Sequence, residues 1–280
     1  MRVSSLTLFG PERRRIFAAY GLLTIEEISL LALPALIGVT IDRLLSGDQT
    51  GLLLLACGAG AILVSGALRR FFDTRVFSAA EQRLSQTVMS SADSPGVQVG
   101  RLRQVYEVVQ TYERSVPEGF SAIIAGVGSL TISAWYDWRV GLAGLVVAAT
   151  LVAMDRLYSG KVERLNAALN GRTERDFAVL SRGSPRGLHT HLTRRRKLQV
   201  ARSDAEIAIY LMNWIVLLAL IIATLALIAA PEAKPGAVFA QLSYILAFAE
   251  SWNRWPALTE RLSHASDVAR RLKGNVQTDV

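Results

Sequence analysis

Two adjacent glutamates, Glu26 and Glu27, are the residues whose type and position most need a chemical explanation. They interrupt an apolar run that starts after Arg15 and ends at Asp42. At ~1.5 Å per residue this run spans roughly 40 Å, enough to cross a bilayer, so both carboxylates are expected near its midplane. Because charge at that depth is costly, the pair predicts a carboxylate that contacts a cationic substrate or carries a proton.

The two glutamates cannot both face one cavity, because adjacent positions on a helix point about 100° apart. We therefore expect one of Glu26 and Glu27 to line a water-filled translocation path, and the other to be neutral or paired. The alternative is that both are partnered with polar groups of neighbouring helices, or that they lie at a shallower depth.

A second set of candidate residues recurs every three or four positions near the carboxyl end: Gln241, Tyr244, Phe248, Trp252 and Trp255. On a helix these side chains form one aromatic and polar stripe. Such a stripe can hold an amphipathic or cationic molecule by stacking and cation–π contacts. Packing between helices is the alternative explanation. Glu250 and Arg254, four residues apart, favour a local ion pair.

The composition indicates a membrane protein. Of 280 residues, 51% are hydrophobic, and the charged residues gather in blocks between long uncharged runs. The net charge of +8 does not indicate nucleic acid, because the basic blocks flank apolar runs. The single cysteine, Cys57, supports neither a disulfide nor a zinc site, and His189 and His191 lack further ligands, so no metal is expected.

The hydropathy pattern predicts an all-α, polytopic fold in one domain over residues 1–280. Six transmembrane helices are predicted, at about 16–41, 51–68, 116–134, 140–154, 207–230 and 237–252. Between them, residues 69–115 and 155–206 are polar and helix-like, with turn signals at 90–100 and 181–187. Asn213 and Glu118, polar groups at or near membrane depth, are explained by hydrogen bonds between helices.

The distribution of basic residues predicts the orientation. Of the 31 Lys and Arg residues, all but Arg43, Arg139 and Lys234 lie at the termini or in the two long polar segments. Because cytoplasmic segments carry the excess of Lys and Arg, both termini and both polar segments are expected in the cytoplasm. The basic run 194–197 follows from this topology and from anionic lipid.

Two short motifs resemble those of a known family. Ile41-Asp42-Arg43-Leu44-Leu45-Ser46-Gly47 closes the first span, which contains Pro34, and Asp137-Trp138-Arg139 lies between spans three and four. Together with the basic amino-terminal elbow and the order of long inner and short outer loops, they resemble the transmembrane domain of exporter-type ATP-binding cassette (ABC) transporters. The resemblance covers nearly the whole chain.

The resemblance implies a homodimer or heterodimer of six-span subunits with long cytoplasmic helices, in a cell inner or plasma membrane. It implies that the last span lines the path for a small-molecule substrate. The tips of the two inner loops would rest on an ATPase partner with bound ATP and magnesium. These tips are Asp93, Ser94, Pro95 and Gly96 in the first loop, and Ser184, Pro185, Arg186, Gly187 and Leu188 in the second.

No nucleotide-binding motif is found in these 280 residues. A phosphate-binding loop needs Gly-x-x-x-x-Gly-Lys-Ser/Thr, so that backbone amides face the phosphates. Around Gly160-Lys161, Asp155 stands in place of the first glycine and Val162 in place of the hydroxyl residue. We therefore expect no catalytic residue and no cofactor in this chain, with ATP hydrolysed by a separately encoded cassette.

Two other functions fit the same sequence. The first is a non-transporting relative that keeps the fold as a membrane scaffold or regulator. The second is an ATP-independent transporter coupled to protonation of Glu26 or Glu27. The sequence does not identify the substrate.

Overall fold

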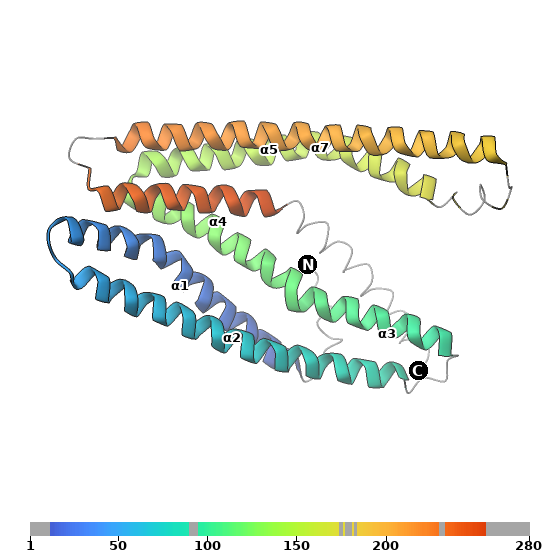
Figure 1. The fold of residues 1–280 in the computed structure, drawn as a ribbon, viewed down its shortest axis with the longest axis horizontal. Helices are drawn as coiled ribbons and strands as arrows, with labels where there is room; N and C mark the ends of the chain where they lie inside the picture. The colour runs from blue at the N-terminus through green and yellow to red at the C-terminus, as the bar shows by residue number, and fades with distance from the viewer. Residues whose placement is uncertain are drawn as a thin grey trace. The chain divides into compact units, whose positions relative to one another are not determined.

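The computed structural model describes residues 12–89, 95–173, 176, 181, 184–229 and 233–255, and every element in these ranges is helical (Figure 1). Asp93 and Ser94, predicted for the first coupling tip, lie outside them. The helices are α1 (Arg13–Leu45), α2 (Thr50–Met89), α3 (Pro95–Gln110), the π-helix η2 (Thr111–Ser115), α4 (Val116–Tyr136), α5 (Trp138–Thr173) and α7 (Pro185–Ile228). A further helix covers residues 235–255.

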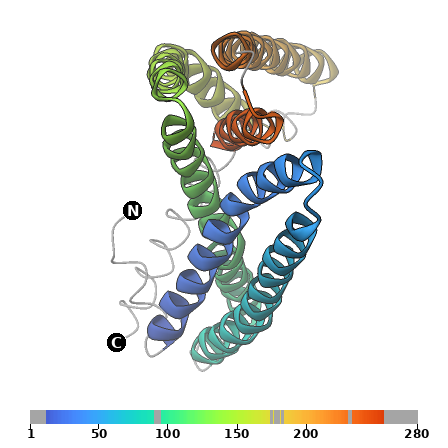
Figure 2. The ribbon, with the colours of Figure 1, turned by 90° about the vertical axis from the view of Figure 1, so that its left-hand side faces the viewer.

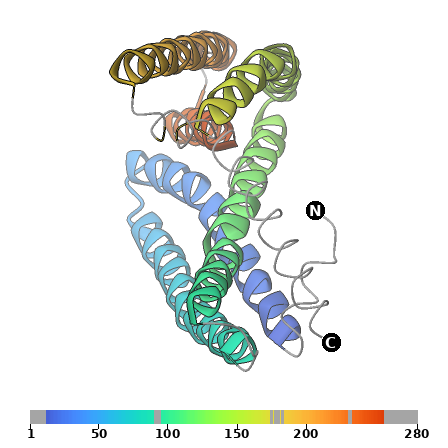
Figure 3. The same cartoon turned by 90° about the vertical axis from the view of Figure 1, so that its right-hand side faces the viewer.

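The chain divides into two compact units, which are described separately. The first comprises Met1–Asp137 with Ile228–Val280, and the second comprises Trp138–Leu227. In the first unit α1 and α2 form a long hairpin, α4 packs against α1, and α3 packs against α2; Figures 2 and 3 show these helices in blue and green. The second unit is the pair α5 and α7, side by side in Figure 1.

A four-residue turn, 46–49, closes the α1–α2 hairpin. Gly47 has φ 82°, a conformation that favours glycine, and the N–H of Asp48 donates to the carbonyl of Arg43 at 2.9 Å. Asp48 caps the start of α2, because its carboxylate accepts the backbone N–H of Thr50 at 2.9 Å and the Thr50 hydroxyl at 2.7 Å. The backbone bond, and then the hydroxyl bond, hold the pKa of Asp48 below its usual value.

The prediction of a polytopic, all-helical membrane protein is confirmed in outline. Within the described residues, five helices are long and apolar enough to cross a membrane: α1, α2, the continuous helix Gly96–Tyr136, Trp138–Leu169 and α7. Residues 235–255 hold the sixth predicted span, but polar side chains such as Gln241 and Glu250 make this helix less apolar, and it is not one of the five. The count of six stays a prediction.

Most of the predicted polar segments are continuations of the apolar helices. α2 extends to Met89, well past the predicted span end at 68, and α7 begins at Pro185, before the predicted span start at 207. In the first unit a buried cluster, mostly outside the predicted spans, holds α1, α2, α3, η2 and the start of α4 together. Its members are Ile16, Val76, Phe77, Ala80, Val88, Val105, Val108, Val109, Tyr112 and Val116. Hydrophobic burial therefore orders these arms.

Candidate functional site

An ion pair between Glu26 of α1 and Arg69 of α2 lies across the hairpin, and Arg69 also reaches Asp73 at 3.0 Å. The side chains of Glu26, Arg69 and Asp73 are only 10%, 19% and 13% exposed. Glu26 precedes Ser46 by 20 residues (46 − 26), and Arg69 follows Gln49 by 20 (69 − 49). About 30 Å of helix therefore separates the ion pair from the turn.

The ion pair supports the alternative in which Glu26 is partnered with a polar group of a neighbouring helix. Its expected depth near the midplane stays a prediction. The close approach is allowed by Gly66, where a Cβ atom would lie 2.7 Å from Oε1 of Glu26. One guanidinium thus compensates two carboxylates inside the α1–α2 hairpin.

Glu27 has a different partner on a different helix. Its Oε1 accepts a hydrogen bond of 2.6 Å from the hydroxyl of Ser121 on α4. The two adjacent carboxylates therefore diverge, as the helical geometry predicts. Glu26 is paired with a cation, whereas Glu27 accepts a bond from a neutral hydroxyl, so the two carboxylates differ in charge compensation.

The stripe Gln241, Tyr244, Phe248 and Trp252 lies on the helix 235–255. Gln241, Tyr244 and Phe248 are buried, and Trp252 is half-buried. The Tyr244 hydroxyl donates to the carbonyl of Leu31 on α1 at 2.8 Å, and its ring centre is 6.3 Å from that of Tyr136 on α4. These contacts within the first unit support the packing explanation for Tyr244. The predicted ion pair between Glu250 and Arg254 is confirmed.

Asp42 makes a contact that the sequence did not predict. Its Oδ1 accepts the backbone N–H of Gly236 at 2.8 Å, in the first turn of the helix 235–255. Lys234 stands before this helix, at a position where a capping Ser, Thr, Asp or Asn is usual. The lack of a local capping residue is the sequence signal that the cap comes from elsewhere in the chain. A Cβ on Gly38 would overlap the carbonyl of Gly236, so the two backbones touch.

In the second unit, the predicted coupling tip Ser184–Leu188 forms the start of α7. Ser184 caps this helix, since its carbonyl accepts the N–H of Leu188 at 2.9 Å and its hydroxyl accepts that of Gly187 at 3.3 Å. The segment from Ser184 to Gly187 is exposed. In the first loop, Pro95 begins α3 and Gly96 is exposed. These exposed positions are compatible with coupling tips that a partner protein can reach.

Asp176 bridges two residues of α7 near this tip, a cluster that the sequence did not predict. Its carboxylate lies 2.7 Å from Nε2 of His191 and 3.0 Å from Nη1 of Arg195. His191 is buried, at 6% exposure, while Asp176 and Arg195 remain partly exposed. The cluster ties Asp176 to the second and third turns of α7.

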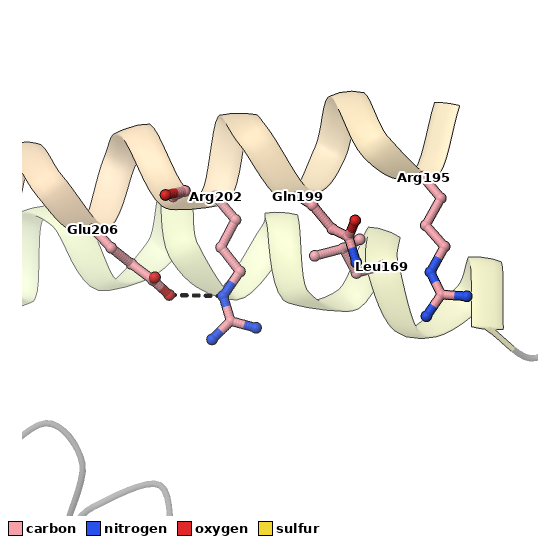
Figure 4. Close-up of a pocket in the computed structure, with 6 residues that line it drawn as sticks. Leu169, Arg195, Gln199, Arg202 and Glu206 are labelled. Atoms are coloured by element: carbon pink, nitrogen blue, oxygen red, sulfur yellow. Dashed lines mark hydrogen bonds and ion pairs between the residues drawn. The ribbon is translucent and has the colours of Figure 1, made fainter. Parts of the chain in front are cut away.

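An open groove of about 410 Å³ runs beside this cluster, and Figure 4 shows the residues that line it. They are Leu169, Arg195, Gln199, Arg202, Ser203 and Glu206. Arg202 Nε pairs with Glu206 at 2.7 Å, so the groove carries both signs of charge. Among the described residues, no three His, Cys, Asp or Glu side chains gather as metal ligands. Gly160 and Lys161 lie inside α5, away from any strand-to-helix turn.

The five long apolar helices of the described residues are typical of a polytopic helical membrane protein. The family model of the ABC transporter transmembrane region matches residues 9–234, and the chain belongs to this family. The comparison with curated proteins gives no match.

Proposed function

We propose that this chain is the membrane-spanning subunit of an exporter-like ABC transporter. Two such subunits, identical or different, would form a translocation path across a cell inner membrane, with both termini in the cytoplasm. A separately encoded ATPase would bind at the tips of the helical arms and drive alternating access to the path. The observation that carries the proposal is the family match over residues 9–234.

The helical arms support this role. α2 and α3 in one unit, and α5 and α7 in the other, continue beyond the apolar stretches, and the charge pattern favours the cytoplasm for these extensions. In this proposal Ser184–Leu188 contacts the ATPase. The exposed backbone and the serine cap give the tip a defined helical start that a partner can recognise.

The two glutamates have different partners, and this difference decides which of them we place in the translocation path. Glu26 is neutralised by Arg69, so we assign the path-facing role to Glu27, which is half-buried and bonded to Ser121. The ion pair also weighs against Glu26 as the proton carrier of an ATP-independent transporter, because Arg69 already holds its carboxylate. The stripe from Gln241 to Trp252 is kept as a second, more deeply packed set of candidates.

Copurification tests the partnership. The chain, extracted gently from its native membrane, should bring an ATPase subunit with it, and replacement of Ser184–Leu188 by a Gly-Ser segment of equal length should abolish the association. The exposed Arg196 on the same helix offers a control, because Arg196→Gln should leave the association intact. Recovery of the native protein without any ATPase would contradict the proposal and favour the scaffold alternative.

Transport tests the path. In vesicles that contain the chain and its ATPase, Glu27→Gln should change substrate affinity or flux while ATPase binding persists. Glu26→Gln should act mainly on stability, because it breaks a structural ion pair. Equal transport by wild type and Glu27→Gln would remove Glu27 from the path.

A further inference from the structure

The helix that joins the first arm to the next membrane-spanning segment contains an irregular joint. α3, η2 and α4 follow one another without a break from Pro95 to Tyr136, and the middle piece, Thr111–Ser115, is π-helical. The N–H of Val116 donates to the carbonyl of Thr111, five residues back, where an α-helix would use the carbonyl of Tyr112. Short π-helical insertions of this kind are frequent at functional sites.

Pro117 extends the irregularity by one residue. In a π-helix each N–H donates to the carbonyl five residues back, so the donor to the carbonyl of Tyr112 would be residue 117. That residue is proline, which has no N–H. The α-helical donor, Val116, is already directed to Thr111. The backbone of the joint therefore supplies neither of the two regular donors to Tyr112.

A residue of another helix supplies that donor. The hydroxyl of Tyr20 on α1 donates to the carbonyl of Tyr112 at 2.8 Å. The Tyr20 ring also lies 5.8 Å, centre to centre, from the ring of Phe120 on α4, beyond the joint. One side chain thus touches the helix at the π-helical piece and again two turns later.

We propose that Tyr20 is a positioning residue that sets the bend between the arm α3 and the segment α4, by replacing the backbone donor that Pro117 removes. The inference stands apart from the transport function, since it concerns the equilibrium of the joint alone. Bonds that a side chain makes to a kinked helix select one bend angle, because other angles lengthen them.

The chain offers a direct test of this replacement. In the Pro117→Ala variant, residue 117 regains its N–H and can serve Tyr112, so the Tyr20 hydroxyl becomes dispensable. Cys57 is the single cysteine, and after Cys57→Ser, spin labels are placed at Val99 on α3 and Val127 on α4, both exposed. Electron–electron distance measurements on the protein in lipid nanodiscs then report the bend.

With Pro117 present, Tyr20→Phe should shift the populations of bent and straighter forms by about fivefold, the effect of one hydrogen bond. With Pro117→Ala, the same substitution should shift them less than about twofold, because the two changes are coupled. Thr24→Val is the matched control, since the Thr24 hydroxyl bonds only within α1, to the carbonyl of Tyr20 at 2.9 Å.

Unchanged distances in Tyr20→Phe would overturn the proposal. Equal shifts in both backgrounds would also overturn it, because they would show that the hydroxyl acts independently of the missing donor. A shift in Thr24→Val as large as that of Tyr20→Phe would do the same, and this comparison needs only the native proline.

Discussion

The carboxylate of Asp42 accepts the backbone N–H of Gly236 at 2.8 Å, although 194 positions separate the two residues. The bond joins the end of α1 to the start of the helix 235–255. A negative side chain at that place satisfies an unpaired N–H and also interacts favourably with the helix dipole. A residue of the family-like motif at the end of the first span thus caps the last described helix.

Loss of this cap should destabilise the protein. We expect Asp42→Ala to lower the free energy of unfolding by about 1 kcal/mol, and Asp42→Asn by less, because the amide oxygen still accepts the bond. Thermal unfolding in nanodiscs measures the difference. Asp204→Ala removes an exposed carboxylate for comparison. An unfolding midpoint of Asp42→Ala equal to that of Asp204→Ala would refute the capping role.

Two glycines of α1 should respond in opposite ways to alanine. Gly38→Ala forces a Cβ into the carbonyl of Gly236, and we expect a cost of about 1–3 kcal/mol, as in other overpacked contacts. Gly21→Ala meets nothing within 4 Å and should be neutral or slightly stabilising. Thermal unfolding compares the pair. Similar midpoints for both variants would show that α1 and the last helix separate easily.

The Glu26–Arg69 pair predicts a partial rescue. Arg69→Met leaves Glu26 and Asp73 without their cation and should cost about 3 kcal/mol. Adding Glu26→Gln should recover part of this loss, because one uncompensated carboxylate disappears. Arg70→Met, at the exposed neighbouring position, should have little effect. Denaturant or thermal unfolding gives the values, and a double variant less stable than Arg69→Met would disprove the assignment.

The Asp176 cluster should control the order of the second tip. Asp176→Ala removes the partner of both His191 and Arg195, so we expect faster backbone hydrogen exchange over residues 184–195. Asp176→Asn should show a smaller increase, because one acceptor oxygen remains. Glu206→Ala, which loses only an exposed pair with Arg202, is the control. Unchanged exchange in Asp176→Ala would mean that the tip is ordered without the cluster.

Features set by local periodicity could be read from the sequence. Long apolar runs locate the helices, and the spacing of four residues locates the Glu250–Arg254 pair. The divergence of Glu26 from Glu27 follows from helical geometry alone. None of these features needs information about which helices are neighbours.

Features that depend on partners far along the chain could not be read in this way. The hydrogen bonds from Gly236 to Asp42 and from Tyr20 to Tyr112 could not be predicted, because each depends on how two helices pack. The pairing of Glu26 with Arg69 was missed for the same reason, because it depends on how α1 and α2 pack. Counting residues from the turn at Gly47 would have matched Glu26 with Arg69.

Glu26 and Arg69 lie equally far along the chain from the turn 46–49, and this spacing affects which lipids suit the protein. Twenty residues on each side of the turn place the Glu26–Arg69 ion pair about 30 Å along the hairpin from the turn. With the turn at one surface of the bilayer, lipids with longer acyl chains would place the ion pair inside hydrocarbon, and tilt or local thinning would have to relieve the hydrophobic mismatch. The stability of the protein should therefore fall as acyl chains lengthen beyond this value.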